Sequence, residues 1–220
     1  MDLSALIREF VTLFVLVDPI GSIPVFLFAV TAVPQRLHRR FAVRAVAIAG
    51  IVLFLFLVLG QLALESIGLR LGSFEIAGGI VLFLFALTMI FGETKSDAEI
   101  EEAERHDNHL GGAVFPLAMP SIASPGAMLG IVVLTDNRTQ SLAEQAVTGA
   151  LLLLVLAITL ACLLAATWIF RVIGHTGTSV ISRVMGIILA TIAVDAVLGG
   201  FESLGLFEVQ EVVPADLPPG

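Results

Sequence analysis

Uncharged apolar runs long enough to cross a bilayer recur along this chain, and they constrain its fold more than any other feature. A membrane-spanning helix needs about 20 predominantly apolar residues, because the hydrocarbon layer is about 30 Å thick and each helical residue rises about 1.5 Å. Four runs carry no charge, and two carry one acid each, Asp18 and Asp195. The uncharged runs are residues 45–64, 76–91, 110–135 and 145–170, and the interrupted ones are residues 10–33 and 184–201. The sequence therefore predicts an all-α polytopic membrane protein with six transmembrane helices.

The composition agrees with a chain that lies mostly in lipid. Of the 220 residues, 58% are hydrophobic and 14% are charged, whereas soluble domains carry about 25% charged residues. The formal net charge of −8 argues against a nucleic-acid partner, which favours a basic surface. The single cysteine, Cys162, allows neither an intrachain disulfide nor a metal cluster. We therefore expect a lipid-embedded protein without a metal site or another cofactor.

The basic residues predict an orientation, because cytoplasmic loops hold lysine and arginine in excess. Eight of the 11 bases fall on one side of the predicted helices: Arg36, Arg39, Arg40, Arg44, Lys95, Arg105, Arg171 and Arg183. The other three are Arg8, Arg70 and Arg138. Both termini are therefore expected to be extracytoplasmic. The first helix is expected to remain uncleaved, because Asp18 and Pro19 interrupt it where the apolar core of a signal peptide would continue.

The chain divides into two halves of three helices each. Residues 1–92 form the first predicted half and residues 110–204 the second. Between them, residues 93–109 hold seven acids and two bases, which indicates a solvated cytoplasmic linker. His106 and His109 lie in this linker and are interpreted as solvated side chains rather than metal ligands. Residues 205–220 contain three prolines and are expected to form a flexible extracytoplasmic tail.

Two of the predicted helices contain helix-breaking clusters at matching places. Pro19 and Pro24 stand five residues apart in the first helix, and Pro120 and Pro125 stand five apart in the fourth, 101 residues later. Proline removes a backbone donor and clashes with the preceding turn. Non-helical backbone at membrane depth persists only where it is buried in protein or lines an aqueous cavity. Simple proline kinks are the alternative, because prolines are common in membrane-spanning helices.

The paired breaks predict an inverted repeat. Three helices per half is an odd number, so the second half enters the bilayer upside down, and such repeats place a substrate site near the midplane at their broken helices. A weaker similarity relates residues 74–80 to residues 181–187 and aligns Gly79 with Gly186. The predicted architecture is therefore two inverted three-helix repeats with broken helices 1 and 4.

The polar residues of these helices are the candidates for binding. A carboxylate at the bilayer centre costs about 2.5 to 3.5 kcal/mol on insertion scales, so Asp18 should face the interior. It is interpreted either as a coupling or amine-binding carboxylate, or as a cap for the amides of the second half-helix. Asp195 is a second coupling-ion candidate, with snorkelling to water as its alternative. The other predicted substrate-binding residues lie at the two breaks: Gly21, Ser22, Ser121, Ser124 and Gly126.

Catalysis is not expected. Ser121 and Ser124 have no histidine or lysine base near them in the sequence, as a serine nucleophile requires. Neither a phosphate-binding loop of the GxxxxGK[ST] type nor a GxGxxG dinucleotide fingerprint occurs. ATP-driven pumping by this chain is therefore excluded.

Three motifs carry a family resemblance. They are DPIGSIPVF at residues 18–26, PLAMP at 116–120 running into SPGA at 124–127, and RVMG at 183–186 with IAV at 192–194. These motifs resemble the MarC family of bacterial inner-membrane proteins, whose relatives include the SnatA-type neutral amino acid transporters. The resemblance covers nearly the whole chain and implies six spans, a bacterial inner-membrane location and, for the SnatA-like branch, import of small neutral amino acids. The chain departs from the family at Ser124, where glycine is usual, and at Asp195, where an amide side chain is common.

Together these features predict a secondary transporter for a small polar solute, such as a neutral amino acid, driven by a H+ or Na+ gradient. An exporter of drugs or metabolites is the alternative within transport. A non-transporting scaffold or regulator that docks partners on residues 93–109 is the alternative from another class. The sequence leaves homo-oligomerisation open.

Overall fold

The computed structural model describes residues 3–31, 33–68, 70–91, 113–135 and 141–206, and the regular structure within these ranges is helical throughout. The predicted linker, 93–109, and residues 207–220 of the predicted tail lie outside the described residues. The elements in chain order are α1 (Leu3–Val17), α2 (Ser22–Ala29), the 3-10 helix η1 (Gln35–Leu37), α3 (His38–Ile67), α4 (Leu71–Phe91), the π-helix η2 (Ala113–Ile122), α6 (Pro125–Leu134), α7 (Leu142–Leu164) and α8 (Ala166–Ser203).

Five of the described helical segments are long and apolar enough to cross a membrane. They are Leu3–Ala29, Gln35–Gly60, Gly72–Phe91, Ala143–Leu164 and Thr176–Ser203. The remaining expected span, residues 110–135, is divided within its described part into η2 and α6, and α6 has ten residues. A helical protein that crosses a membrane several times is thus confirmed.

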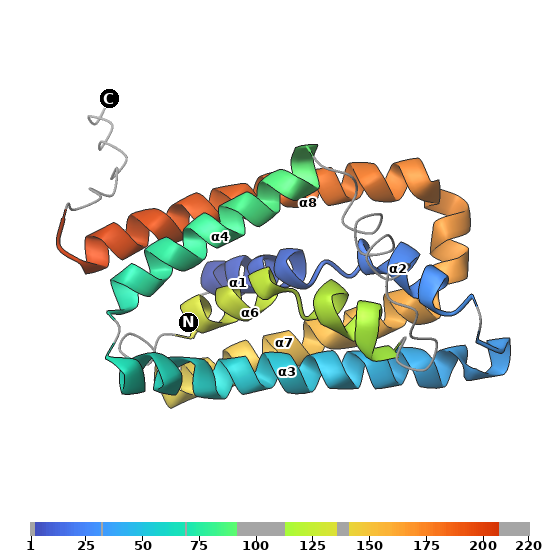
Figure 1. Cartoon of the computed structure of the whole chain (residues 1–220), viewed down its shortest axis with the longest axis horizontal. Coiled ribbons are helices and arrows are strands. Elements are labelled where there is room, and N and C mark those ends of the chain that lie inside the picture. Colours follow the sequence, from blue (N-terminus) through green and yellow to red (C-terminus); the bar gives the residue numbers. More distant parts are fainter. Residues whose placement is uncertain (1–2, 32, 69, 92–112, 136–140, 207–220) are drawn as a thin grey trace, which may run out of the picture.

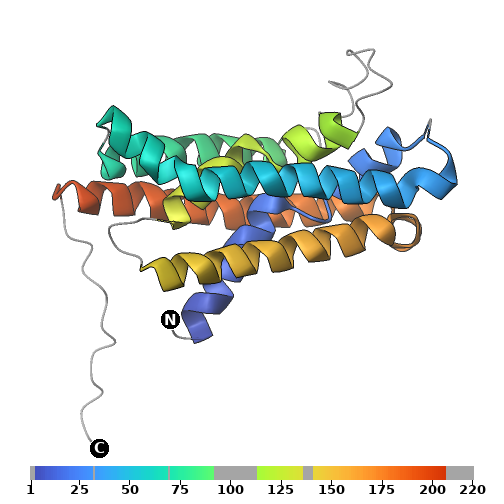
Figure 2. The same cartoon turned by 90° about the horizontal axis from the view of Figure 1, so that it is seen from below.

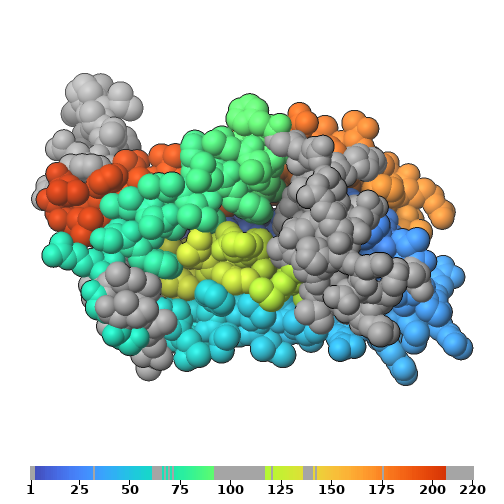
Figure 3. All heavy atoms as spheres, viewed as in Figure 1, coloured from blue at the N-terminus to red at the C-terminus, as the bar shows by residue number. Residues whose placement is uncertain are grey.

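The two interrupted segments lie between the other helices in Figure 1, and they run in opposite directions in both views (Figures 1 and 2). In Figure 1, α4 and α8 lie on one side of them, and α3 and α7 lie on the other. The surface of α6 shows between α3 and α4 in Figure 3, and α6 contacts both helices. The most apolar stretch of Leu3–Ala29 is 72% buried, against 22% to 39% for the other four spans. The first broken segment is therefore the most enclosed span described.

The connection between α7 and α8 differs from the prediction. The uncharged run was expected to form one helix over residues 145–170, but α7 ends at Leu164 and α8 begins at Ala166. A kink at Gly174, which has a left-handed φ of 68°, divides α8. Glycine adopts this conformation without steric cost. The apolar run predicts which residues can lie in lipid. It does not predict the turn at Ala165, because no proline, glycine or charged residue marks that position.

Glycines allow α4 and α8 to pack closely along their lengths. A Cβ atom added at Gly72 would lie 2.7 Å from the carbonyl oxygen of Gly200, and one added at Gly79 would lie 2.8 Å from the carbonyl oxygen of Ala193. A Cβ atom added at Gly186 would lie 2.9 Å from Met89 Cβ. Small residues at helix interfaces are typical of membrane proteins, because close backbone approach replaces the hydrophobic driving force that lipid removes.

Two of these glycine contacts are equivalent under one sequence shift. Gly186 follows Gly79 by 107 residues, and Ala193 follows Ala86 by the same number. A Cβ atom at Gly79 would approach the Ala193 carbonyl, and a Cβ atom at Gly186 would lie 3.2 Å from the Ala86 carbonyl. The shift of 107 residues therefore relates the contact between Gly79 and Ala193 to the contact between Gly186 and Ala86.

Candidate functional site

The first break joins α1 to α2 through a left-handed residue, Asp18. Its φ is 48°, a value that aspartate adopts more readily than most residues other than glycine. The Asp18 amide donates to the Phe14 carbonyl at 3.0 Å, and the Ser22 amide donates to the Asp18 carbonyl at 3.2 Å. The Gly21 amide donates to Asp18 Oδ1 at 3.0 Å. The side chain thus satisfies one of the amides at the beginning of α2 that lack a helical partner.

The second carboxylate oxygen of Asp18 has no hydrogen-bond partner among the residues that the structure describes. Asp18 is 2% exposed, and its Oδ2 atom is buried. A Cβ atom at Gly21 would overlap Oδ2 and would lie 2.7 Å from Asp18 Cγ. The structure therefore shows the capping role of Asp18 through Oδ1, and its role as a binding or coupling carboxylate stays a prediction.

The second break separates η2 from α6. The Ala123 amide donates to the Ala118 carbonyl at 2.9 Å, five residues back as in a π-helix. Ser124 is extended and caps α6, because its Oγ accepts from the Ala127 amide at 3.0 Å. Pro125 occupies the first helical position, where a backbone N–H would have no partner within the helix. The predicted break in the fourth helix therefore consists of a π-turn followed by a capped half-helix.

A buried serine pair joins the two broken segments. Ser121 Oγ donates to Ser22 Oγ at 3.1 Å, and Ser22 Oγ donates to the Asp18 carbonyl at 3.1 Å. Both serines are fully buried. Ser121 thereby links η2 to the break that holds Asp18. The structure brings Asp18, Ser22 and Ser121 together.

The paired prolines occupy different local positions in the two breaks. Pro19 lies inside the first break and Pro24 is the third residue of α2, whereas Pro120 lies within η2 and Pro125 begins α6. The proline spacing predicts two interrupted helices but not where each interruption falls, because proline is compatible with a break and with the first turn of a helix. Gly126 is buried in α6, where an added Cβ would lie 3.2 Å from Phe85 Cδ1.

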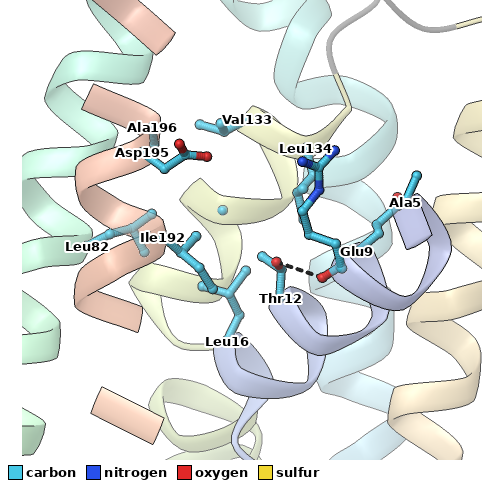
Figure 4. Close-up of a pocket in the computed structure, with 12 residues that line it drawn as sticks. Ala5, Glu9, Thr12, Leu16, Leu82, Val133, Leu134, Ile192, Asp195 and Ala196 are labelled. Carbon is cyan, nitrogen blue, oxygen red and sulfur yellow. Dashed lines mark hydrogen bonds between the residues drawn. The ribbon is translucent and has the colours of Figure 1, made fainter. Parts of the chain in front are cut away.

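A cavity of about 340 Å³ lies beyond the breaks, toward the N-terminal end of α1 (Figure 4). Residues of α1, α4, α6 and α8 line it, and its polar wall includes Arg8, Glu9, Thr12 and Asp195. Leu16 also lines the cavity, and a Cβ atom at Gly130 would lie 2.5 Å from Leu16 Cδ1. The contact between α1 and α6 at Leu16 therefore bounds the cavity on the side of Asp18.

Glu9 is a buried carboxylate that the sequence analysis did not select. It is 6% exposed, and its Oε1 accepts a hydrogen bond from Thr148 Oγ1 of α7. Its Oε2 is buried and has no partner in the described part of the chain. Glu9 directly precedes the apolar run that begins at Phe10, so the sequence places it among the flanking charges. The available signal was helical spacing, because Glu9, Thr12 and Leu16 recur every three to four residues and share one face of α1.

Asp195 lies in this cavity rather than at the breaks. Figure 4 shows its carboxylate on α8 pointing toward the cavity, across from Thr12 of α1. Asp195 is exposed, and so is Arg8. Within the described residues, no group of three or more His, Cys, Asp or Glu side chains is placed to hold a metal ion. Asp18 and Asp195 thus belong to two separate sets of polar groups, one at the breaks and one in the cavity.

Comparisons with known proteins agree with a membrane protein. The family described as MarC family integral membrane protein matches residues 3–204. The chain is 32% identical over 198 residues to a UPF0056 membrane protein of Archaeoglobus fulgidus, with 90% of this chain and 92% of the relative covered. It is 33% identical to a UPF0056 membrane protein of Aquifex aeolicus, with the same two shares covered.

A third relative is the UPF0056 inner membrane protein YhgN of Escherichia coli, which is 28% identical over 90% of this chain and 96% of its own length. No solved structure gives a significant match. The family match spans both interrupted segments and the cavity. The chain therefore belongs to the MarC family of integral membrane proteins.

Proposed function

We propose that this protein is a secondary transporter for a small polar solute, such as a neutral amino acid, coupled to a H+ or Na+ gradient. The observation that supports this proposal most strongly is the unpaired Oδ2 atom of Asp18 at the junction of two interrupted helices. An ionisable residue within a membrane span is expensive to bury and generally serves an ion or substrate pathway. Interrupted helices near the midplane are the usual ligand-binding elements of such carriers.

The proposed substrate site lies between the two breaks. The N-terminal ends of α2 and α6 carry the partial positive charge of a helix dipole, which favours a substrate carboxylate nearby. Asp18 Oδ2 offers an acceptor to an ammonium group or a coupling cation. Asp18, Ser22, Ser121 and Ser124 are all buried, so the site is closed to solvent in this conformation. Alternating access then requires the breaks to separate toward one side at a time.

The proposed architecture is a pair of inverted repeats with six spans, the sixth being η2 and α6 together. The interchangeable glycine contacts of Gly79 and Gly186 support a two-fold relation between α4 and α8. The opposite directions of the two central segments also support it (Figure 1). The unequal placement of the prolines shows that any such relation is approximate.

The proposed location is the bacterial inner membrane with both termini outside. One relative is named as an inner membrane protein. Arg36, Arg39, Arg40 and Arg44 lie at the end of the bundle opposite the beginning of α1, as the positive-inside rule requires for this orientation. Labelling of single cysteines introduced at residue 4 and at residue 36 with a membrane-impermeant reagent, in a Cys162→Ala background, tests the orientation. The proposal predicts labelling of the former alone in intact cells.

Counterflow in liposomes tests the proposed activity. Purified protein is reconstituted into vesicles preloaded with unlabelled alanine, glycine or serine, and entry of the same labelled solute is compared with entry into empty vesicles. A carrier predicts transient accumulation of label without an imposed ion gradient. Absence of counterflow for all three solutes, with protein shown to be folded, contradicts a neutral amino acid carrier. Net flux in intact cells then separates import from export.

A further inference from the structure

We infer that the cavity at the N-terminal end of α1 binds a protonated amine, and that Glu9 is its principal ligand. The inference deepens the proposed function, on which its connection to transport rests, but it concerns a site separate from Asp18. Leu16 packed against Gly130 bounds this cavity on the Asp18 side. The cavity volume of about 340 Å³ is within the range of pockets that hold small organic molecules and exceeds what a bare metal ion needs.

The charged side chains that line the cavity favour a cationic ligand. Two carboxylates, Glu9 and Asp195, and one guanidinium, Arg8, are the charged groups that line it, so ionised side chains leave one net negative charge. Neither carboxylate forms an ion pair with Arg8 within the described residues. The elements α4 and α6 contribute only apolar residues and a glycine to the lining. A ligand with one positive charge therefore neutralises the cavity.

The Oε2 atom of Glu9 favours a ligand that can donate a hydrogen bond. Thr148 donates to Oε1, whereas no group of the described residues donates to Oε2, which is the buried oxygen of a residue that lines the cavity. A buried acceptor without a donor costs about 1 to 3 kcal/mol, and more when the group is charged. A primary ammonium supplies both the charge and the N–H. A quaternary ammonium supplies the charge alone.

Binding of ethylammonium to the purified full-length protein tests this assignment. Thermal unfolding is followed at rising ethylammonium chloride, and at equal concentrations of tetramethylammonium chloride and sodium chloride. A ligand that binds only the folded state raises the unfolding temperature with concentration. We expect ethylammonium to stabilise the protein and the other two salts to have no specific effect. Equal stabilisation by tetramethylammonium or sodium overturns the assignment of a primary amine.

Two variants locate the site. Glu9→Gln retains the acceptor for Thr148 and removes the charge, so it should fold and lose at least tenfold in ethylammonium affinity. Asp195→Asn should lose a few-fold, because this carboxylate is exposed. Glu202→Gln, the same chemical change on α8 outside the cavity lining, is the matched control and should bind as the wild type does. Unchanged affinity in Glu9→Gln overturns the inference, whereas retained binding in a protein without counterflow overturns only the proposed transport.

Discussion

The amide of Gly21 donates to Asp18 Oδ1 at 3.0 Å, and the absence of a side chain at Gly21 makes room for the other oxygen of the same carboxylate. Gly21 therefore contributes to the site in two ways. Its amide donates to Oδ1, and its missing side chain leaves the space that Oδ2 occupies. Any larger residue must displace the Asp18 side chain from its cap. This pair fixes the geometry of the first break.

Gly21→Ala should destabilise the protein by about 1 to 2 kcal/mol, because the added methyl group overlaps Asp18 Oδ2 and the cap is lost. The unfolding midpoint in a mild detergent measures this change. Gly149→Ala is a suitable control, since its nearest neighbour would be Phe54 Cε1 at 3.5 Å, an ordinary contact. Equal midpoints for the two variants would show that the Asp18 side chain moves without cost.

Gly79→Ala and Gly78→Ala form a matched pair on α4. An added Cβ at Gly79 would meet the Ala193 carbonyl at 2.8 Å, whereas one at Gly78 would meet nothing closer than Val133 Cγ2 at 3.8 Å. We expect Gly79→Ala to cost about 1 to 3 kcal/mol, as overpacking does, and Gly78→Ala to be neutral or slightly stabilising. Thermal unfolding distinguishes them. A reversed order of stabilities would contradict the packing of α4 on α8.

The bond between Ser22 and Ser121 should couple the two interrupted segments. A double-mutant cycle with Ser22→Ala, Ser121→Ala and the double variant isolates the pairwise energy. Side-chain hydrogen bonds between membrane helices average about 0.6 kcal/mol in such cycles, and we expect a coupling of about this size. Strict additivity of the two substitutions would mean that the serines do not interact in the membrane.

The capping role of Ser124 can be separated from general helix stability. Ser124→Ala removes the acceptor for the Ala127 amide and should cost about 1 kcal/mol, whereas Ser124→Gly should cost a few tenths. Ser141→Ala removes the equivalent cap at the start of α7, remote from both breaks in the sequence. Both alanine variants should lower stability, but only Ser124→Ala should reduce counterflow. Equal counterflow in the two would remove Ser124 from the proposed site.

The sequence predicts the interrupted helices because proline and aspartate in an apolar run leave few structural alternatives. Asp18, Ser22 and Ser121 are adjacent to these prolines, so their assembly at one junction follows from the same pattern. Glu9 escapes prediction because a charge at the edge of an apolar run is ordinarily solvated. Only the packing of α1 against α7 makes it a buried residue. Three-dimensional contacts likewise decide that Asp195 lines a cavity with Glu9 instead of joining Asp18.

The turn at Ala165 illustrates a different limit. Residues on both sides are apolar and favour helix, so local preference cannot locate the break between α7 and α8. Packing of the connected helices determines it. Gly174 is no clearer a signal in the sequence, because Gly78, Gly79 and Gly186 also lie in helices and have no left-handed φ.

Asp18→Asn provides the most direct test of the proposed function. Asparagine retains an acceptor for the Gly21 amide and tolerates a left-handed φ, so the variant should fold, and it loses only the ionisable carboxylate. Alanine uptake into liposomes is measured under an imposed inward H+ or Na+ gradient, with Glu202→Gln as the control. We expect the wild type and the control to concentrate alanine and Asp18→Asn to fail to do so. Accumulation by folded Asp18→Asn to the wild-type level would contradict this expectation.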